Sequence, residues 1–285
     1  MKNYYYLKRL AVLAIAVSIT TTSCESESKD ELFNQQSISN DKTQSELAFP
    51  DQKGDMVTIS FDGQTIEVEK INDSYVMEGD ILISKEESSK STVKPDKLWP
   101  KGYVYYSISR SLPNKKRVTD AIAHWEANTP LKFIRRTNQR NYINFVKGTG
   151  CSSFVGRVGG AQKIKLGNGC TTGTTIHEIG HAVGLWHEQS RKDRDRYINI
   201  LTQNIESGRE SYFRTYVQRG QNGREYGSFD FNSRMLYSAY AFSKNRRPTI
   251  VKKNGRPYTN NTSSLSRGDK QGILTLYRNE VRRRN

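Results

Sequence analysis

The run HEIGHAVGLWHE, residues 177 to 188, is the part of this sequence that most constrains its fold. His177 and His181 stand four residues apart, so on a helix both imidazoles project from one face and can bind the same metal ion. Glu178 faces the same side and is spaced to hold a water molecule rather than the ion. The run therefore predicts a helix that carries a metal ion and a base.

The spacing continues beyond the helix. Gly184 lets the helix end in a conformation that residues with a β-carbon resist, and the following turn brings back His187 as a third ligand. Three nitrogens and one open position are typical of catalytic zinc. A chance histidine pair is the bland alternative, but three of the four histidines fall in this run. The fourth, His124, lies beside Trp125, and we expect it to be structural or exposed.

Apolar patterning surrounds this run with helices and strands. Period-2 and period-3.6 patterns predict strands at 103–108, 141–146 and 162–166, and helices at 117–128, 174–183 and 266–277. Ser266 is the expected cap of the last helix, and residues 188–264 are loop-rich. Upstream, 24–55 are polar and expected to be flexible, 56–84 alternate like short strands, and 86–94 are polar and open to proteolysis.

The first 23 residues have the order of a cleavable export signal, with basic residues, a short apolar run and then small residues. The apolar run is too short to cross a bilayer. Thr21 to Cys24 resembles a relaxed bacterial lipoprotein cleavage site, although Thr21 stands where Leu is commonest. We expect an exported protein, extracellular or at the outer cell envelope, with Cys24 as a candidate for lipidation and membrane attachment.

Charge divides the chain sharply. Residues 24–90 hold 6 Lys and Arg against 16 Asp and Glu, a net charge of −10, whereas 91–285 hold 36 against 13, a net of +23. An acidic stretch before a basic domain predicts mutual attraction, or else a solvated linker before an unrelated domain. The basic residues are scattered without a nucleic-acid-binding motif, so we expect no specific nucleic-acid partner. Acidic protein substrates or a polyanionic matrix fit the charge equally well.

Export permits disulfides, and the chain has 3 cysteines. Cys151 and Cys170 flank a predicted strand, whereas Cys24 lies beside the signal cleavage site. We therefore predict the pair Cys151–Cys170, which would contribute roughly 3 kcal/mol on the chain-entropy model.

Residues 177–188, followed by Gln189-Ser190-Arg191 and by 193–197, resemble the astacin family of metzincin proteases. The resemblance extends from about Leu98 to Tyr277. It implies an α+β fold with two lobes: an upper lobe with a twisted, mostly parallel five-stranded sheet and the active-site helix, and a loop-rich lower lobe. It also implies one Zn²⁺ per chain.

Downstream, Ser233 to Tyr237 resembles the family's Met-turn. The resemblance implies that Met235 lies under the metal and that Tyr237 is a further zinc ligand that moves away when substrate binds. The chain departs from the pattern at Leu236, where the family usually has His.

The disulfide region also resembles the family. Residues 159–166 would then be the edge strand along which an extended peptide lies. Both partners of the family's second disulfide are missing here, which points to a minimal bacterial-type member without accessory domains.

Met77 to Ile81 resembles a short motif of astacin propeptides whose Asp binds the zinc and displaces the catalytic water, which makes Asp80 the candidate. A plain turn is the alternative. Cys24 is a rival switch, because a thiolate also binds zinc. The resemblance further implies activation by a cut between about Lys85 and Lys94, with the new N-terminus buried near Glu188.

The expected protein is a monomeric, secreted zinc endopeptidase that hydrolyses internal peptide bonds of proteins and is made as a zymogen. Its expected domains are a signal peptide at 1–23, an acidic propeptide at 24–90 that inhibits the chain from within, and a catalytic domain at 91–285. The competing class is a non-catalytic envelope lipoprotein that holds a polyanion. Lys244, Arg246 and Arg247 follow the Met-turn and predict a preference for acidic side chains just after the scissile bond.

Overall fold

The computed structural model describes residues 46–61, 63–84 and 97–284. The predicted signal peptide, Cys24 and the predicted activation segment lie outside the described residues. Within the described part, no helix is both long and apolar enough to span a membrane.

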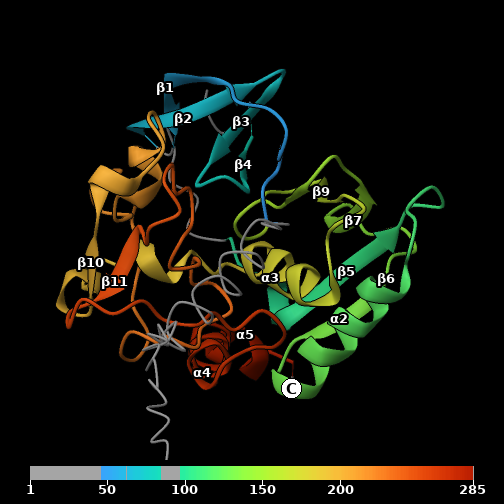
Figure 1. Ribbon diagram of the computed structural model, residues 1–285. Helices are drawn as coiled ribbons and strands as arrows, with labels where there is room; N and C mark the ends of the chain where they lie inside the picture. Colours follow the sequence, from blue (N-terminus) through green and yellow to red (C-terminus); the bar gives the residue numbers. More distant parts are fainter. Residues whose placement is uncertain (1–45, 62, 85–96, 285) are drawn as a thin grey trace, which may run out of the picture.

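The upper lobe is built on one five-stranded sheet with the strand order β6-β5-β7-β9-β8. Four strands are parallel, and only β8 runs antiparallel to its neighbour. The strands are β5 (Tyr103–Ile108), β6 (Lys132–Arg135), β7 (Tyr142–Lys147), β8 (Cys151–Ser152) and β9 (Ala161–Leu166). Helices α2 (Lys116–Asn128) and α3 (Thr172–Ala182) pack together beside it (Figure 1). The predicted α+β fold with a mostly parallel five-stranded sheet is confirmed.

Tryptophans join the upper-lobe helices through their indole nitrogens. Trp125 on α2 is fully buried, and its Nε1 donates to the carbonyl of Ile176 on α3 at 3.1 Å. Trp99 Nε1 donates to the carbonyl of Ala182 at the end of α3, at 2.9 Å. Each buried indole thus has its polar group satisfied while it fills the core. These contacts hold the middle and the C-terminal end of the helix that carries the first two histidines.

Residues 159–166 do not form the free edge that the sequence predicts. β9 lies between β7 and β8, and Leu166 and Lys165 pair with the two residues of β8. The strand β8 is too short to give a periodic signal, so the sequence pattern could not reveal it. The edge of the sheet is therefore β8, and Cys151 on this strand is joined to Cys170 before α3, as predicted.

The lower lobe has little regular structure. A two-stranded sheet pairs β10 (Ile198–Ile200) with β11 (Ile250–Lys252). Its core is rich in aromatic side chains and includes Leu236, which occupies the position of the family's usual His. The short 3₁₀ helices are Pro100–Gly102, Glu188–Ser190, Arg194–Arg196, Thr202–Asn204 and Glu210–Phe213. Two further helices, α4 (Arg267–Leu276) and α5 (Arg278–Arg282), are the last elements that the structure describes.

Residues 46–84, called the N-terminal segment below, fold onto both lobes. They form an antiparallel sheet of β1 (Asp55–Phe61), β2 (Gln64–Ile71), β3 (Ser74–Met77) and β4 (Ile81–Ile83), as the alternation at 56–84 predicts (Figure 1). The flexibility expected up to residue 55 is wrong for its last residues. Ala48 is buried, and its amide donates to the carbonyl of Gly79 at 2.8 Å.

Candidate active site

Helix α3 places the first two histidines in the interior between the lobes. Thr171 caps the helix by accepting a hydrogen bond from the amide of Thr174 at 3.1 Å. Gly180 allows a close approach from below, because a β-carbon there would lie 2.7 Å from the sulfur of Met235. Met235 therefore packs directly against the helix that carries His177 and His181.

The three histidines of the run converge. His177 Nδ1 donates to the carbonyl of Arg234 at 3.0 Å, and His181 Nδ1 donates to the carbonyl of Leu185 at 2.8 Å. His187 Nδ1 is hydrogen-bonded to the Glu78 carboxylate. These contacts fix each ring through Nδ1, so that Nε2 is the nitrogen turned toward Asp80, which is how proteins orient metal-binding histidines.

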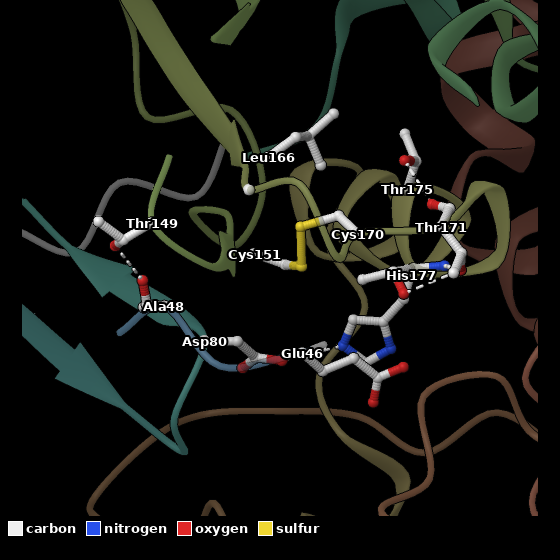
Figure 2. Close-up of a disulfide and its surroundings, with 12 residues drawn as sticks. Glu46, Ala48, Asp80, Thr149, Cys151, Leu166, Cys170, Thr171, Thr175 and His177 are labelled. Atoms are coloured by element: carbon white, nitrogen blue, oxygen red, sulfur yellow. Dashed lines mark hydrogen bonds and ion pairs between the residues drawn. A yellow bond between two sulfur atoms is a disulfide. The ribbon is translucent and has the colours of Figure 1, made fainter. Parts of the chain in front are cut away.

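Asp80 meets the three Nε2 atoms. Its Oδ2 lies 3.1 Å from His177 Nε2, 3.7 Å from His181 Nε2 and 3.3 Å from His187 Nε2. The ligand atoms of the four residues all lie within 4.8 Å of one another, so the group can hold a metal ion. Asp80 lies beside the His177 ring and near the Cys151–Cys170 disulfide (Figure 2).

The chemistry of this donor set fits zinc. Imidazole nitrogen and carboxylate oxygen are both zinc ligands. His181 Nε2, His187 Nε2 and Asp80 Oδ1 are buried without a hydrogen-bond partner. Such atoms are costly unless something binds them. Burial lowers the pKa of His181 to about 4, so this imidazole is neutral at pH 7 and can donate its lone pair to a metal.

Two carboxylates differ in their protonation preference at this site. Burial and the nearby Asp80 charge raise the pKa of Glu178 well above its usual range. Burial alone would also raise the pKa of Asp80, but the positive charge of His187 and the histidine hydrogen bonds hold it well below its usual value. Neither oxygen of Glu178 has a hydrogen-bond partner. Asp80 thus favours the anion, and Glu178 is poised to take a proton.

Tyr237 lies beside the histidines. Its ring centroid is 4.7 Å from that of His187, but its hydroxyl donates to the Glu78 carbonyl. Burial, with the charges of Glu78 and Asp80, raises its pKa well above the usual value. The phenol is therefore protonated and held by the N-terminal segment.

Glu188 lines a cavity of about 260 Å³ that adjoins the site through His187 and that Asp230 and Asp269 also line. Its carboxylate accepts a hydrogen bond from the Asp230 amide at 2.8 Å. Burial, opposed by Arg191, leaves the pKa of Glu188 raised to about 7.

The remaining candidates lie elsewhere. Lys244, Arg246 and Arg247 are exposed on a turn of the lower lobe. His124 is half-buried, and its Nε2 accepts a hydrogen bond from the Leu265 amide at 3.1 Å, which is a structural role.

Charged contacts join the N-terminal segment to the rest of the chain. No single sequence motif predicts them. Among the described residues, four Arg–Glu ion pairs cross this boundary: Arg234–Glu46, Arg214–Glu67, Arg209–Glu69 and Arg219–Glu78. The charge division of the sequence is the only signal that could have found them. It predicts attraction between the two parts but not which residues pair.

Comparison with known proteins agrees with the geometry of the three-histidine site. The sequence model of the peptidase family described as Astacin matches residues 91–278. The chain belongs to the astacin family. Astacins are zinc-dependent peptidases, and the three-histidine site agrees with this membership.

Two astacin relatives come from animals. Blastula protease 10 of Paracentrotus lividus is 43% identical over 177 residues, which cover 59% of this chain and 30% of that protein. Astacin-like metalloprotease toxin 1 of Loxosceles intermedia is 43% identical over 179 residues, covering 60% of this chain and 67% of the toxin. The match to the first relative therefore spans less than a third of its length.

Among solved structures, the hatching enzyme zinc-protease High choriolytic enzyme 1 of Oryzias latipes has a similar fold. The TM-score is 0.57 at 30% identity, and the match covers 64% of this chain and 92% of that one. The astacin fold of the catalytic part is thus supported by both sequence and structure.

Proposed function

We propose that this chain is the precursor of an exported zinc endopeptidase that its own N-terminal segment keeps latent. The observation that carries the proposal is the position of Asp80, whose carboxylate oxygen lies 3.1 Å to 3.7 Å from the Nε2 atoms of three histidines. A carboxylate in this position takes the place that a catalytic water needs. Release of the segment would open it.

In the processed enzyme, His177, His181 and His187 would hold one zinc ion, which supplies Lewis-acid activation of water and of the scissile carbonyl. Glu178 accepts a proton from the attacking water and delivers it to the leaving amine. Tyr237, freed from the Glu78 carbonyl, donates a hydrogen bond to the developing oxyanion. The substrates are proteins or peptides, cleaved at internal bonds by a monomer.

Activation is proposed to cut between Lys85 and Lys94, so that the propeptide spans 24–90 and the catalytic domain 91–285. The cavity beside Glu188 would then receive the new N-terminus. A buried carboxyl with a raised pKa gains a partner when a cationic amine arrives.

Export by residues 1–23, lipidation at Cys24 and an extracellular or outer-envelope location belong to the same proposal and rest on sequence. Cys24 as a rival zinc switch also stays a prediction. The bacterial-type assignment stays a prediction as well, since the relatives compared above come from animals.

The experiment compares Glu178→Gln with the parent after limited cleavage by trypsin, which can cut after Lys85 or Lys90 and is then inhibited. We expect casein cleavage to fall by about 10²–10⁴ while one zinc per chain is retained, because general-base catalysis is lost and the ligands are intact. The exposed Glu206→Gln is the matched control and should cleave like the parent. Equal cleavage by both variants, or a processed parent that only binds polyanions, would favour the non-catalytic alternative.

A further inference from the structure

Glu78 of the N-terminal segment is buried against residues that lie beyond this segment in the chain. The residue is 1% exposed. One carboxylate oxygen pairs with Arg219, the other is hydrogen-bonded to His187 Nδ1, and the carbonyl accepts the Tyr237 hydroxyl. A single acidic residue of the N-terminal segment therefore contacts a candidate zinc ligand, the candidate oxyanion donor and a cation.

Arg219 belongs to the part of the chain that remains after activation. It is 4% exposed, and its Nη1 donates to the carbonyl of Arg214 at 2.7 Å. Its own amide donates to the carbonyls of Thr215 and Tyr216, both at 3.2 Å. The guanidinium is thus held in place by a turn of the lower lobe, independently of the N-terminal segment.

The carboxylate that balances Arg219 comes from outside the catalytic domain. Within the described part of the chain, Glu78 is the carboxylate paired with this guanidinium. The neighbouring cation Arg194 instead has Asp195 at 3.0 Å and the Gln189 carbonyl at 2.9 Å. A buried cation that loses its only paired anion is strongly unfavourable unless water or another anion replaces it. Departure of the N-terminal segment would leave Arg219 without its paired carboxylate, beside the metal site.

We propose that Arg219 is a specificity-determining residue of the processed enzyme and binds an acidic side chain of the substrate where Glu78 lies in the precursor. This proposal rests on the proposed endopeptidase function and assigns its substrate class to a defined residue. It moves the acidic preference from the exposed cluster of Lys244, Arg246 and Arg247 to a buried guanidinium.

The backbone path between Glu78 and Asp80 determines which substrate positions the experiment must test. Glu78 and Gly79 both have positive φ, 51° and 84°, so the backbone turns between the pocket and Asp80 rather than running as a strand. The substrate position whose side chain reaches Arg219 is therefore found by scanning. The probe is a quenched fluorescent peptide with one cleavable bond, carrying Glu or Gln in turn at the three positions on each side of that bond.

For the processed parent, we expect one position at which Glu raises kcat/KM over Gln by about tenfold or more, as a charge-assisted hydrogen bond allows. In Arg219→Gln the ratio at that position should fall to about one, and Arg219→Lys should retain part of it. Arg214→Gln is the matched control, because this arginine pairs with Glu67 at the surface and should leave the ratio intact.

The salt dependence of the Glu/Gln ratio distinguishes binding of the acidic side chain by buried Arg219 from binding by the exposed cluster. A buried pair is screened little, so the Glu/Gln ratio should persist at about 0.5 M NaCl, where interactions between exposed charges are largely screened. Loss of the ratio in salt, or in a Lys244→Ser, Arg246→Ser, Arg247→Ser variant, would assign it to the exposed cluster and overturn the proposal.

Survival of the ratio in Arg219→Gln would also overturn the proposal, as would a parent without any Glu preference. Should Arg219→Gln fail to fold, the precursor variant Glu78→Gln with Arg219→Gln keeps the pair neutral during folding and supplies the processed enzyme for the same measurement. Cleavage of the Gln peptides by the parent tests the endopeptidase function separately. A parent that cleaves no peptide contradicts the proposed function rather than the role of Arg219.

Discussion

If the proposed activation occurs, Tyr237 takes different hydrogen-bond partners before and after it. In the precursor its hydroxyl is bonded to the Glu78 carbonyl, and its ring lies 4.7 Å from that of His187. The same hydroxyl is the candidate donor to the oxyanion once Glu78 has left. Its role in catalysis can therefore be separated from its role in packing.

Replacing Tyr237 by Phe should remove only the hydroxyl. In the processed enzyme we expect kcat to fall on the order of 10² with KM little changed, because the lost hydrogen bond acts in the transition state. Zinc content should stay at one per chain, since three histidines remain. A rise in KM with unchanged kcat would instead show that Tyr237 only binds substrate.

At the residue scale the sequence was most informative where chemistry fixes the spacing. His177, His181 and His187 are brought together as predicted, and Asp80 reaches them. Glu78 and Arg219 were not identified, although Glu78 lies inside a quoted motif. One Glu in a turn and one Arg in an irregular loop carry no periodic signal, and only the folded chain brings residues so far apart into contact.

At the scale of elements, the docking of α3 depends on small residues. A β-carbon at Gly173, in the first turn of the helix, would lie 1.9 Å from the Thr262 carbonyl oxygen. The obstacle is backbone, which cannot rotate away as a flexible side chain can. The helix that carries His177 and His181 is therefore tightly seated at its start.

Gly173→Ala should lower the free energy of unfolding by about 1–3 kcal/mol, because overpacking outweighs the better helix propensity of Ala. Gly169→Ala is the matched control just before the helix, where a β-carbon would meet nothing within 4 Å. Its effect should stay within about 0.5 kcal/mol. Urea unfolding of both precursors measures the difference, and equal midpoints would contradict this account of the docking.

The elements that the sequence predicted are those with long periodic patterns. Helices α2, α3 and α4 and strands β5, β7 and β9 lie within two residues of their predicted bounds. β6 and β8 have four and two residues, too short for a pattern to emerge. The family resemblance placed the sheet edge at residues 159–166, whereas β8 lies beyond β9 in the structure.

At the scale of the whole molecule, opposite charge holds the two parts together. Among the described residues, three of the four Arg–Glu ion pairs across the boundary involve an arginine that is at least nine-tenths buried, whereas Arg214–Glu67 lies near the surface at 2.8 Å. Salt should therefore weaken the surface part of the predicted attraction but have little effect on the buried ion pairs.

After a cut within 85–94, the N-terminal segment should leave faster in about 1 M NaCl than in dilute buffer, because salt screens the exposed pair and the long-range attraction. Glu69→Gln should speed release at both salt concentrations, because it breaks the buried pair with Arg209. The rate at which peptide cleavage appears measures release, and a rate independent of salt would argue against electrostatic retention.

The latency account depends on one carboxylate in the unprocessed chain. Asp80→Ala removes the oxygen nearest the three histidines and leaves the remaining contacts of the N-terminal segment in place. The most direct test is therefore peptide cleavage by the uncut, zinc-loaded precursor, with and without this substitution. Zinc content and an intact chain are checked in both samples.

The account predicts that the uncut parent is silent, whereas uncut Asp80→Ala cleaves the peptide and a zinc chelator stops it. An uncut Asp80→Ala precursor that holds one zinc per chain and stays as silent as the parent would contradict the central claim that Asp80 blocks the metal site.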